Sequence, residues 1–484
     1  MIDFLQPYTT QDLIHDSACI VDLSFIKRDK SYFLSRVQYW KNVFRENGYK
    51  TITISSNPSI DTIAMLFACA ELGVLIETSN LDDGAEAFLR RTKTSEICYV
   101  GKHFSSSWFD YRNIQSGPLA HKPIQVLDEK AVTKFMESNH LEYIPEVINT
   151  ANDLICGEVT GVPNSRVVHT SGPFMYGGKL SADLYTPEDT FGSTNGVAHI
   201  GLTTQTVLGP LFAGATLYTI NNFYDLVFMA GRNLFTKLFF YDIHLKLTEW
   251  HPNFSFQPGA LKGTTVFTAG NLPSPHFLDI VFGLDAKKII TGFGTNAAAS
   301  PLFMMEINNK QFDVYQSGIG QLRDEIQVKI IDNRLWVKTP SQTVHVATDA
   351  NGYFDTGDYI KQEGNKFFFM GKGITQLPSG NRVFSVQLQD YIQSVSNGDM
   401  FYSEFMLETP NATDTEINIY PLSLRAHDII SDATDRIKVL LQDKLENPGL
   451  EKINVHKVPN DVNLFAGRIH LGRVKQLIAE GKTL

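Results

Sequence analysis

The chain has 484 residues, of which 43% are hydrophobic and 19% charged, and its formal net charge is −10. At roughly 150 residues per domain this length predicts about three domains or subdomains. An acidic chain without a Lys/Arg run is not expected to bind nucleic acid or an anionic membrane. No apolar run reaches the about 18 residues of a membrane helix, and the first residues lack signal-peptide features, so we expect a cytoplasmic protein with no membrane partner.

The four cysteines lie far apart in the sequence and do not show the spacing of metal ligands. We expect reduced, mostly buried thiols, as in a cytosolic protein. These residues are Cys19, Cys69, Cys98 and Cys156.

The first part of the chain alternates between helical and strand patterns. Residues 29–48 place apolar side chains at helical spacing, and Ser59 is a cap signal for a second helix that ends near Gly73. Helices that alternate with short apolar strands predict a parallel α/β sheet. The predicted strands are residues 49–55, 74–77, 96–101 and 123–127.

Two stretches in the middle of the chain are candidates for ligand contacts. Residues 154–156 predict a strand, and the Gly/Thr/Pro/Ser loop that follows can offer N–H groups and hydroxyls to phosphate oxygens. Residues 197–217 are largely apolar, and His199 is the one ionisable side chain among them. A single histidine in such a run is more often a core or pocket-wall residue than a catalyst.

Two further strands are followed by glycine turns. Residues 266–283 predict a strand, a Gly-Asn-Leu-Pro turn and a helix that starts at Ser274-Pro275. Residues 288–296 predict a strand and then a Gly-aromatic-Gly turn. Open α/β sheets bind ligands where their strands end, so both turns are candidate site segments.

Residues 351–383 predict a hairpin with a polar segment, Asp355–Asp358, followed by Gly371-Lys372-Gly373. Alone, this stretch is typical of a surface hairpin, although two glycines around a lysine suit a hinge. We place the domain boundary there. Two strands are predicted within 326–338, and after the boundary we predict helices over 386–395 and 429–445, strands over 417–421 and 453–458, and a last helix after Gly467.

In chain order, these stretches resemble the motifs of the adenylate-forming superfamily, which comprises acyl-CoA synthetases, non-ribosomal peptide adenylation domains and luciferases. Each segment is moderately specific, whereas their order and spacing are much more so. The segments are residues 57–78, 160–163, 209–217, 269–275, 293–295, 353–358, 371–383 and 467–469.

The resemblance implies a fold of two parts. Residues 1–371 would form a large N-terminal AMP-binding-like α/β domain of parallel sheets and helices with a small β-barrel-like part. Residues 372–484 would form a small mobile α+β C-terminal domain.

The resemblance also implies a reaction. A small carboxylic acid attacks the α-phosphate of ATP, with Mg²⁺ on the polyphosphate, and forms an acyl adenylate and pyrophosphate. A thiol of CoA, or of phosphopantetheine on an acyl carrier protein, then takes the acyl group. This chemistry requires positive charge on the transferring phosphate and anchored ribose hydroxyls.

Roles follow position by position from the same resemblance. Asp358 would hold the ribose hydroxyls, and Lys372 and Arg468 would be the catalytic cations. The remaining nucleotide contacts would be Thr160, Gly161, Pro163, Gly270, Gly294, Thr295 and Asn296. The acyl pocket would be bordered by His199, Gly292 and Phe293, and its apolar character suits an acyl or aryl group.

Several motif positions depart from the superfamily pattern. Asn164 replaces the phosphate-loop lysine, Glu158 puts a carboxylate near the phosphates, and Ala297 replaces the Mg²⁺-ligating glutamate. At the hinge segment, Leu377 and Gln387 replace a lysine and a glutamate. A less favoured alignment uses residues 169–172 as the phosphate loop, with Lys179 as its cation.

Three hypotheses remain from the sequence. The first is a divergent acid–thiol ligase, favoured by Asp358 and the cation at Arg468. The second is a catalytically impaired pseudo-ligase that binds an acyl group, a nucleotide or a protein partner without adenylation. The third is an altered reaction that keeps only the thiol-transfer half and starts from a thioester or adenylate made elsewhere. Ala297 and Glu158 favour the second and third, and fold alone does not choose among them.

Overall fold

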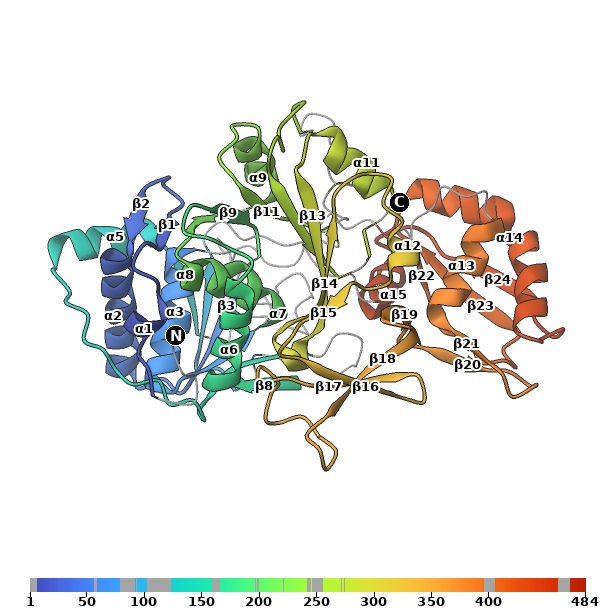
Figure 1. The fold of residues 1–484 in the computed structure, drawn as a ribbon, viewed down its shortest axis with the longest axis horizontal. Coiled ribbons are helices and arrows are strands. Elements are labelled where there is room, and N and C mark those ends of the chain that lie inside the picture. Colours follow the sequence, from blue (N-terminus) through green and yellow to red (C-terminus); the bar gives the residue numbers. More distant parts are fainter. Residues whose placement is uncertain are drawn as a thin grey trace.

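The structure is a computed structural model, which describes residues 7–55, 59–78, 92, 94–101, 123–158, 166–195, 197, 200–220, 222–241, 245, 256–270, 272–273, 275–395, 405–459 and 471–484. Figure 1 shows the N-terminal elements on the left, a second group of strands and helices in the middle, and the C-terminal elements on the right.

The first sheet collects strands from the N-terminal third of the chain. Its order is β6-β5-β3-β4-β7-β8, and only the β7–β8 pair is antiparallel. This arrangement confirms the predicted parallel α/β sheet. Its strands are β3 (Thr51–Ser55), β4 (Leu75–Thr78), β5 (Ile97–Gly101), β6 (Ile124–Leu127), β7 (Asp153–Glu158) and β8 (Arg166–Thr170).

The second sheet has nine strands in the order β15-β14-β13-β12-β11-β9-β10-β1-β2. Its six inner strands, from β13 to β1, are parallel, and antiparallel strands flank them. The strands are β1 (Cys19–Val21), β2 (Lys27–Asp29), β9 (Thr190–Ser193), β10 (Thr216–Thr219), β11 (Lys237–Phe239), β12 (Thr265–Ala269), β13 (Lys288–Thr295), β14 (Ser300–Ile307) and β15 (Gln321–Leu322).

Helices fill the space between the two sheets. Every residue of α3 (Ile60–Leu72) from Ile60 to Glu71 is buried, as expected of a helix that is covered on all sides. One core cluster joins α3 to strands of both sheets. The other helices of this part are α1 (Thr10–Leu13), α2 (Lys30–Asn47), α5 (Glu129–Ser138), α6 (Ser171–Ala182), α7 (Ile200–Thr203), α8 (Gly209–Ala213), α9 (Phe223–Ala230), α11 (Pro275–Gly283) and α12 (Val314–Ser317), with a π-helical turn η3 (Thr204–Leu208) and a 3-10 turn η5 (Asn296–Ala298).

Two carboxylates of α3 are buried and paired with cations of α2. Asp61 lies 2.7 Å from Arg36, and Glu71 lies 2.6 Å from Lys41. All four side chains are fully buried. Removing one partner would leave an uncompensated buried charge, so these pairs fix how α2 packs on α3.

A third sheet of four antiparallel strands follows the second, and it is the counterpart of the small barrel-like part that we expected within residues 1–371. It runs β16-β17-β18-β19, with β16 (Gln327–Ile331), β17 (Arg334–Lys338), β18 (Phe354–Glu363) and β19 (Lys366–Gly371). The β18–β19 pair is the hairpin predicted for residues 351–383.

The C-terminal elements have a core of their own. A buried cluster from Leu377 to Ile453 packs α13 and α14 against β22, β23 and β24. The elements are β20 (Ile374–Gln376), β21 (Arg382–Phe384), α13 (Ser385–Val395), β22 (Phe405–Leu407), β23 (Glu416–Pro421), α14 (Leu424–Lys444), β24 (Lys452–Val455) and α15 (Leu471–Ala479). We propose that these elements form the small domain expected for residues 372–484.

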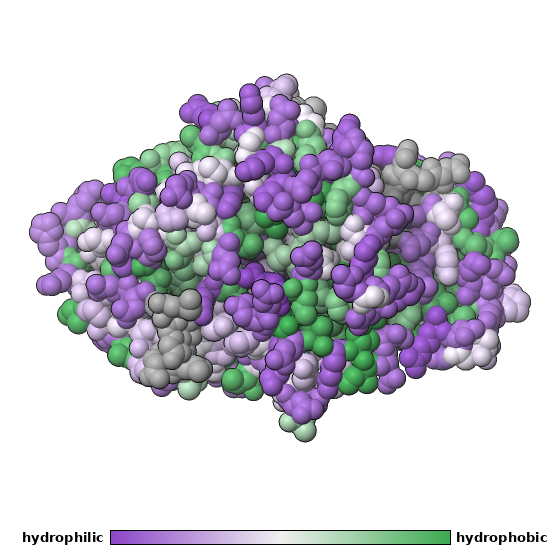
Figure 2. Space-filling view, in the orientation of Figure 1, coloured by the Kyte–Doolittle hydropathy of each residue, from purple (hydrophilic) through white to green (hydrophobic). Residues whose placement is uncertain are grey.

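The face seen in Figure 2 is largely hydrophilic, with apolar residues in scattered groups. None of the helices in the described part of the chain is both long and apolar enough to cross a membrane. Cys69, Cys98 and Cys156 are buried and Cys19 is partly buried, as expected.

Two details of the predicted elements were wrong. Residues 292–294 do not form a turn, because β13 continues to Thr295 and pairs with β14, with a bulge between Phe293 and Gly294. The long C-terminal helix begins at Leu424, capped by Ser423, rather than at 429. The Ser59 cap signal is confirmed, because Ser59 accepts a hydrogen bond from the Thr62 N–H at the start of α3. The Ser274 cap and Gly467 lie outside the described residues.

Two glycines of α6 let this helix approach the next helical segment closely. A Cβ at Gly177 would lie 2.4 Å from the carbonyl oxygen of Ala299. A Cβ at Gly178 would lie 2.6 Å from Cβ of Leu208 in η3. Both distances are shorter than carbon atoms tolerate, so the contact between α6 and its neighbours requires glycine here.

Gly177→Ala should therefore destabilise the fold by about 1–3 kcal/mol, because a backbone carbonyl cannot rotate away from the added methyl as a side chain could. Urea unfolding followed by circular dichroism measures the effect. The matched control is Gly283→Ala at the end of α11, where an added Cβ has open space. Equal unfolding midpoints for the two variants would contradict this account of the packing.

Candidate functional site

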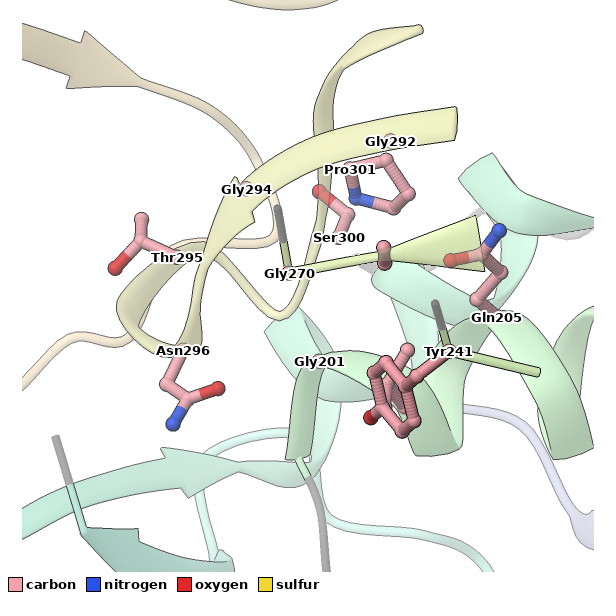
Figure 3. A pocket seen from close by; sticks show the side chains of 12 residues that line it. Gly201, Gln205, Tyr241, Gly270, Gly292, Gly294, Thr295, Asn296, Ser300 and Pro301 are labelled. Atoms are coloured by element: carbon pink, nitrogen blue, oxygen red, sulfur yellow. The ribbon is translucent and has the colours of Figure 1, made fainter. Parts of the chain in front are cut away.

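A pocket lies where three parallel strands of the second sheet end. Ala269 is the last residue of β12, Gly292 and Gly294 belong to the end of β13, and Tyr241 follows β11. This edge of an open α/β sheet is the usual place for a ligand. The described lining residues are Gly201, Leu202, Gln205, Tyr241, Ala269, Gly270, Gly292, Gly294, Thr295, Asn296, Ser300 and Pro301 (Figure 3).

The pocket brings together five residues that were predicted for the site. Gly270, Gly294, Thr295 and Asn296 were expected to contact the nucleotide, and Gly292 the acyl group. They come from two segments about 20 residues apart in the sequence, and all five line the same pocket. Their roles toward a ligand stay predictions.

Glycine is required at the centre of this wall. A Cβ on Gly294 would lie 2.7 Å from the carbonyl oxygen of Ser300 on the neighbouring strand. Gly270 has a φ of +98°, a backbone conformation that residues with a side chain rarely adopt. The two glycines therefore keep the backbone itself at the pocket surface.

The turn after β13 is held in place from three directions. Nε2 of His169 in β8 lies 2.6 Å from the carbonyl oxygen of Asn296. The backbone N–H of Thr343 donates to the carbonyl oxygen of Ala297 at 2.8 Å. The Thr204 hydroxyl donates to the carbonyl oxygen of Ala299 at 2.6 Å. Each bond fixes a carbonyl group next to the pocket. The wall formed by Thr295 and Asn296 is thus rigidly placed before any ligand arrives.

His169 is neutral near pH 7, so only one of its ring nitrogens carries a proton. A carbonyl oxygen only accepts, so Nε2 carries the proton and Nδ1 is left as a buried acceptor that has no hydrogen-bond partner within the described residues. Burial lowers the pKa of His169 from its ordinary value to about 4, while the bond to Asn296 acts in the opposite direction.

Ala297, which the sequence resemblance aligned with the superfamily's Mg²⁺-ligating glutamate, is buried. It belongs to an apolar cluster with Leu302, Phe303 and Phe354. The cluster offers nothing that would stabilise a charged ligand set. Across the described residues, His, Cys, Asp and Glu side chains do not gather into a group of three that could hold a metal ion. The residues at this position do not fit Mg²⁺.

Phe293 does not line the pocket. In β13 it follows Gly292, and successive residues of a strand face opposite sides of the sheet. It packs on Phe303 at 6.0 Å and on Phe369 of β19 at 5.6 Å. Phe293 therefore connects the pocket strand to the β18–β19 hairpin instead of bordering the acyl pocket.

Asp358 and Lys372 meet in this hairpin. Lys372 Nζ lies 2.7 Å from Asp358 Oδ1, and only 4% of the Asp358 side chain is exposed. The strand register explains the contact, because Tyr359 pairs with Gly371 and so places the two side chains next to each other. The predicted ribose anchor thus already carries a cationic partner, and neither residue is among those that line the pocket.

The glycines around Lys372 are needed for close packing. A Cβ on Gly371 would lie 1.9 Å from Ser385 Oγ, and one on Gly373 would lie 2.1 Å from Thr409 Oγ1. Gly371 also has a φ of +105°. Both residues contact the C-terminal elements in this structure, and a hinge at this joint stays a prediction.

Residues 159–165 of the predicted phosphate loop, with Thr160, Gly161 and Pro163, lie outside the described residues, and so do His199 and Arg468. Glu158 is described and ends β7, where it pairs with Arg166 of β8. On the far side of the loop, Arg166 of β8 is bound to the buried Glu77 of β4 at 2.8 Å. This cation is therefore already engaged by a carboxylate.

The alternative phosphate loop at 169–172 is already hydrogen-bonded within the protein. The N–H groups of Ser171 and Gly172 donate to the carbonyl oxygens of Asn152 and Thr150, each at 2.9 Å. Its supposed cation, Lys179, lies over the ring of Tyr176. These amides are not available to a phosphate.

Several lining residues were not predicted from the sequence. Gln205 is the most informative, because a polar side chain inside the apolar run 197–217 was itself a signal. Ser300 and Pro301 come from β14, which we did not predict. The full set that was missed is Gly201, Leu202, Gln205, Tyr241, Ala269, Ser300 and Pro301.

No family model matches this sequence, and no curated protein matches it. Solved structures do resemble the fold. ATP-bound MatB from Rhodopseudomonas palustris has a TM-score of 0.69 and 12% identity, covering 92% of this chain and 93% of that chain. The anthranilate CoA ligase AuaEII with anthranoyl-AMP has a TM-score of 0.68 and 12% identity, over 99% and 98%. McyG A-PCP with phenylalanyl-adenylate has a TM-score of 0.69 and 13% identity, over 99% and 96%.

At these identities the similarity shows the fold. The chain has the fold of the adenylate-forming enzymes over nearly its whole described length. The resemblance drawn from the order of the sequence motifs is confirmed at this level.

The low pKa of His169 predicts how stability depends on pH. Between pH 6.5 and about 4 the unfolded chain binds a proton at this residue and the folded chain does not. Stability is therefore highest above pH 6.5 and falls as the pH drops toward 4, by roughly 1.4 kcal/mol per unit at most. His169→Gln, which keeps an N–H donor, should reduce this fall by about 2 kcal/mol between pH 7 and 4.5.

Urea unfolding of the wild type and the variant at several pH values tests this prediction. The matched control is His140→Gln at an exposed position. If His169→Gln and the control lose stability equally on acidification, the buried neutral histidine is not the cause.

Proposed function

We propose that this chain is a divergent adenylate-forming ligase, which activates a small carboxylic acid with ATP and passes the acyl group to a thiol of CoA or of a carrier protein. The observation that supports it most is that residues predicted from two separate motifs line a single pocket at the strand ends. The chain also shares its fold with structures solved with ATP or with an acyl adenylate bound.

Within this proposal the wall of the pocket divides into two ends. Thr295 and Asn296 would contact the adenylate, while Gly292, three residues earlier in β13, would face the acyl group. A strand rises about 3.3 Å per residue, so the two ends lie roughly 10 Å apart along the strand. Figure 3 places Thr295 and Asn296 on one side of the pocket and Gln205 and Pro301 on the other.

Charge on the nucleotide side would come from this chain's own cations. Lys372 neutralises Asp358, which leaves that carboxylate's other oxygen to accept from ribose hydroxyls. Arg468 is the cation expected at the α-phosphate. Since Ala297 does not fit a metal ligand, we assign no step to Mg²⁺.

A non-hydrolysable acyl adenylate, in which a sulfamoyl group replaces the phosphate, should bind to the pocket. Gly201→Leu should weaken this binding about tenfold or more, because the leucine side chain would fill the pocket. A Cβ at Gly201 would already lie 3.6 Å from Oδ1 of Asn296, which also lines the pocket. Isothermal titration calorimetry measures the affinity. Gly283→Leu, where an added side chain meets open space, is the control, and equal affinities in the two variants would exclude this pocket as the site.

One observation favours a second function. The burial of Ala297 in an apolar cluster removes the metal contact by which the superfamily supports ATP chemistry. A protein that binds an acyl adenylate or a related ligand without forming it would keep the pocket and lose this contact. The pocket-binding experiment does not separate this pseudo-ligase from a ligase, whereas pyrophosphate release does.

Acid-dependent release of pyrophosphate from ATP should occur with the wild-type chain and fall by about 10²–10³ in Arg468→Ala, because one preorganised charged contact is lost. A coupled pyrophosphate assay over a panel of acyl and aryl acids measures it. Arg425→Ala, at the start of α14, serves as a control for the loss of an arginine. Binding of the adenylate analogue without any pyrophosphate release would support the pseudo-ligase instead.

A further inference from the structure

Gln205 presents the oxygen of its side-chain amide to the pocket. The residue is 2% exposed and lines the pocket, and Nε2 is the enclosed atom of the amide. Figure 3 shows Oε1 facing the other lining residues, while Nε2 is turned away from them. Within the described residues the side chain makes no hydrogen bond, whereas the backbone carbonyl of Gln205 accepts from the Tyr185 hydroxyl at 2.9 Å. An acceptor therefore stands at the pocket surface without a protein donor among the described residues.

The backbone holds this amide in place. Residues Thr204–Leu208 form the π-helical turn η3, and such turns are rare and occur often at functional sites. The Thr204 hydroxyl donates to the carbonyl oxygen of Ala299 at 2.6 Å. Gly178 of α6 packs against the same turn, where an added Cβ would lie 2.6 Å from a side-chain carbon. Gln205 is thus presented from a turn that tertiary packing fixes before a ligand arrives.

A ligand that fills the pocket would cover Oε1 of Gln205. An acceptor on a pocket surface can bond to water, and a ligand displaces that water when it binds. A ligand group with an N–H or O–H would restore the hydrogen bond, whereas a hydrocarbon group would leave Oε1 buried and unpaired. The orientation of the amide therefore favours ligands that donate a hydrogen bond at this point.

The described wall of the pocket has no carboxylate, amine, guanidinium or imidazole group. An ammonium group on the ligand would be desolvated there without a countercharge. A carboxylate on the ligand would likewise lack a countercharge, and it offers no hydrogen to Oε1. Hydroxyl groups and the amino groups of aromatic amines are neutral near pH 7 and can donate, so they match this part of the pocket.

We propose that Gln205 selects the acid, by accepting a hydrogen bond at Oε1 from a neutral hydroxyl or amino group on the acyl part of the substrate. The substrate class is then hydroxy-substituted or aromatic amino-substituted acids. Gln205 lies across the pocket from Thr295 and Asn296, which we assign to the adenylate (Figure 3). A ligand group that reaches it belongs to the acyl part. This inference rests on the proposed function, because it assigns the acyl end of the same pocket.

The test uses acyl sulfamoyladenosines in matched pairs that differ in one donor group. Aminobenzoyl is compared with methylbenzoyl at the ortho, meta and para positions, and an ω-hydroxyacyl chain with the chain in which methyl replaces the hydroxyl. The nitrogen of an aromatic amine is a poor acceptor, so a preference for the amino member reports an acceptor in the protein. As a counter-test, para-methoxybenzoyl, whose added oxygen only accepts, is compared with para-ethylbenzoyl. Calorimetry gives the affinity of each member for the full-length chain.

For at least one donor pair, the donor-bearing member should bind the wild type about tenfold more tightly than its methyl counterpart. The methoxy member should not be preferred over the ethyl member. Gln205→Met, which removes the amide at similar volume, should abolish the donor preference and bind the methyl member at least as well as the wild type does. The control is Thr206→Val on the same turn, whose hydroxyl donates to the carbonyl oxygen of Leu202 at 2.8 Å, and it should keep the preference.

The outcomes separate the two proposals. If the analogues bind but no donor-bearing member is preferred, if the methoxy member is preferred over the ethyl member, or if Gln205→Met keeps the donor preference, the role of Gln205 is overturned while the proposed function stands. Loss of the preference in Thr206→Val as well would overturn it too, since the geometry of the turn would then be responsible. If none of the analogues binds to the wild type, the proposed function fails and the inference fails with it. The wild-type comparisons do not depend on the folding of a variant.

Discussion

The close approach of α6 to the turn after β13 is the constraint on which the candidate site depends. Glycine at position 177 lets the carbonyl of Ala299 lie where a Cβ would otherwise be, and the Thr204 hydroxyl bonds to that same carbonyl. One backbone group thus ties α6, the π-helical turn and the pocket wall together. The position of Gln205 and the position of Asn296 are consequences of the same contact, so the two ends of the pocket are fixed relative to each other.

Much of this fold could be predicted from local patterns. The strong caps at Ser59 and Gly73 bound α3, and the hairpin at β18–β19 follows from its turn residues. The π-helical turn could not be predicted, because residues 197–217 contain mostly apolar side chains and tertiary packing against α6 decides their backbone. Phe293 was misplaced for a similar reason. A Gly-aromatic-Gly sequence is typical of a turn, but pairing with β14 keeps it extended, and the ring packs on Phe303 and Phe369.

Some residues of the candidate site were predicted from the sequence, and others were found only in the structure. The resemblance to the superfamily's motifs predicted Gly270, Gly292 and Gly294, and the structure places them together. The polar side chains of the pocket could not be predicted. Gln205, Tyr241 and Ser300 come from segments that lie outside the predicted site residues and reach the pocket only when the chain is folded. The pairing of Lys372 with the buried Asp358 could be anticipated only from the strand register.

Ala297 and Gln205 lie close to the pocket wall and differ in how their burial affects stability. Ala297 is buried in an apolar cluster, which favours stability and offers no metal ligand. Gln205 Nε2 is a buried donor that has no partner within the described residues, which lowers stability. A leucine at position 205 would pack without an unpaired N–H, so the two positions act on stability in opposite directions.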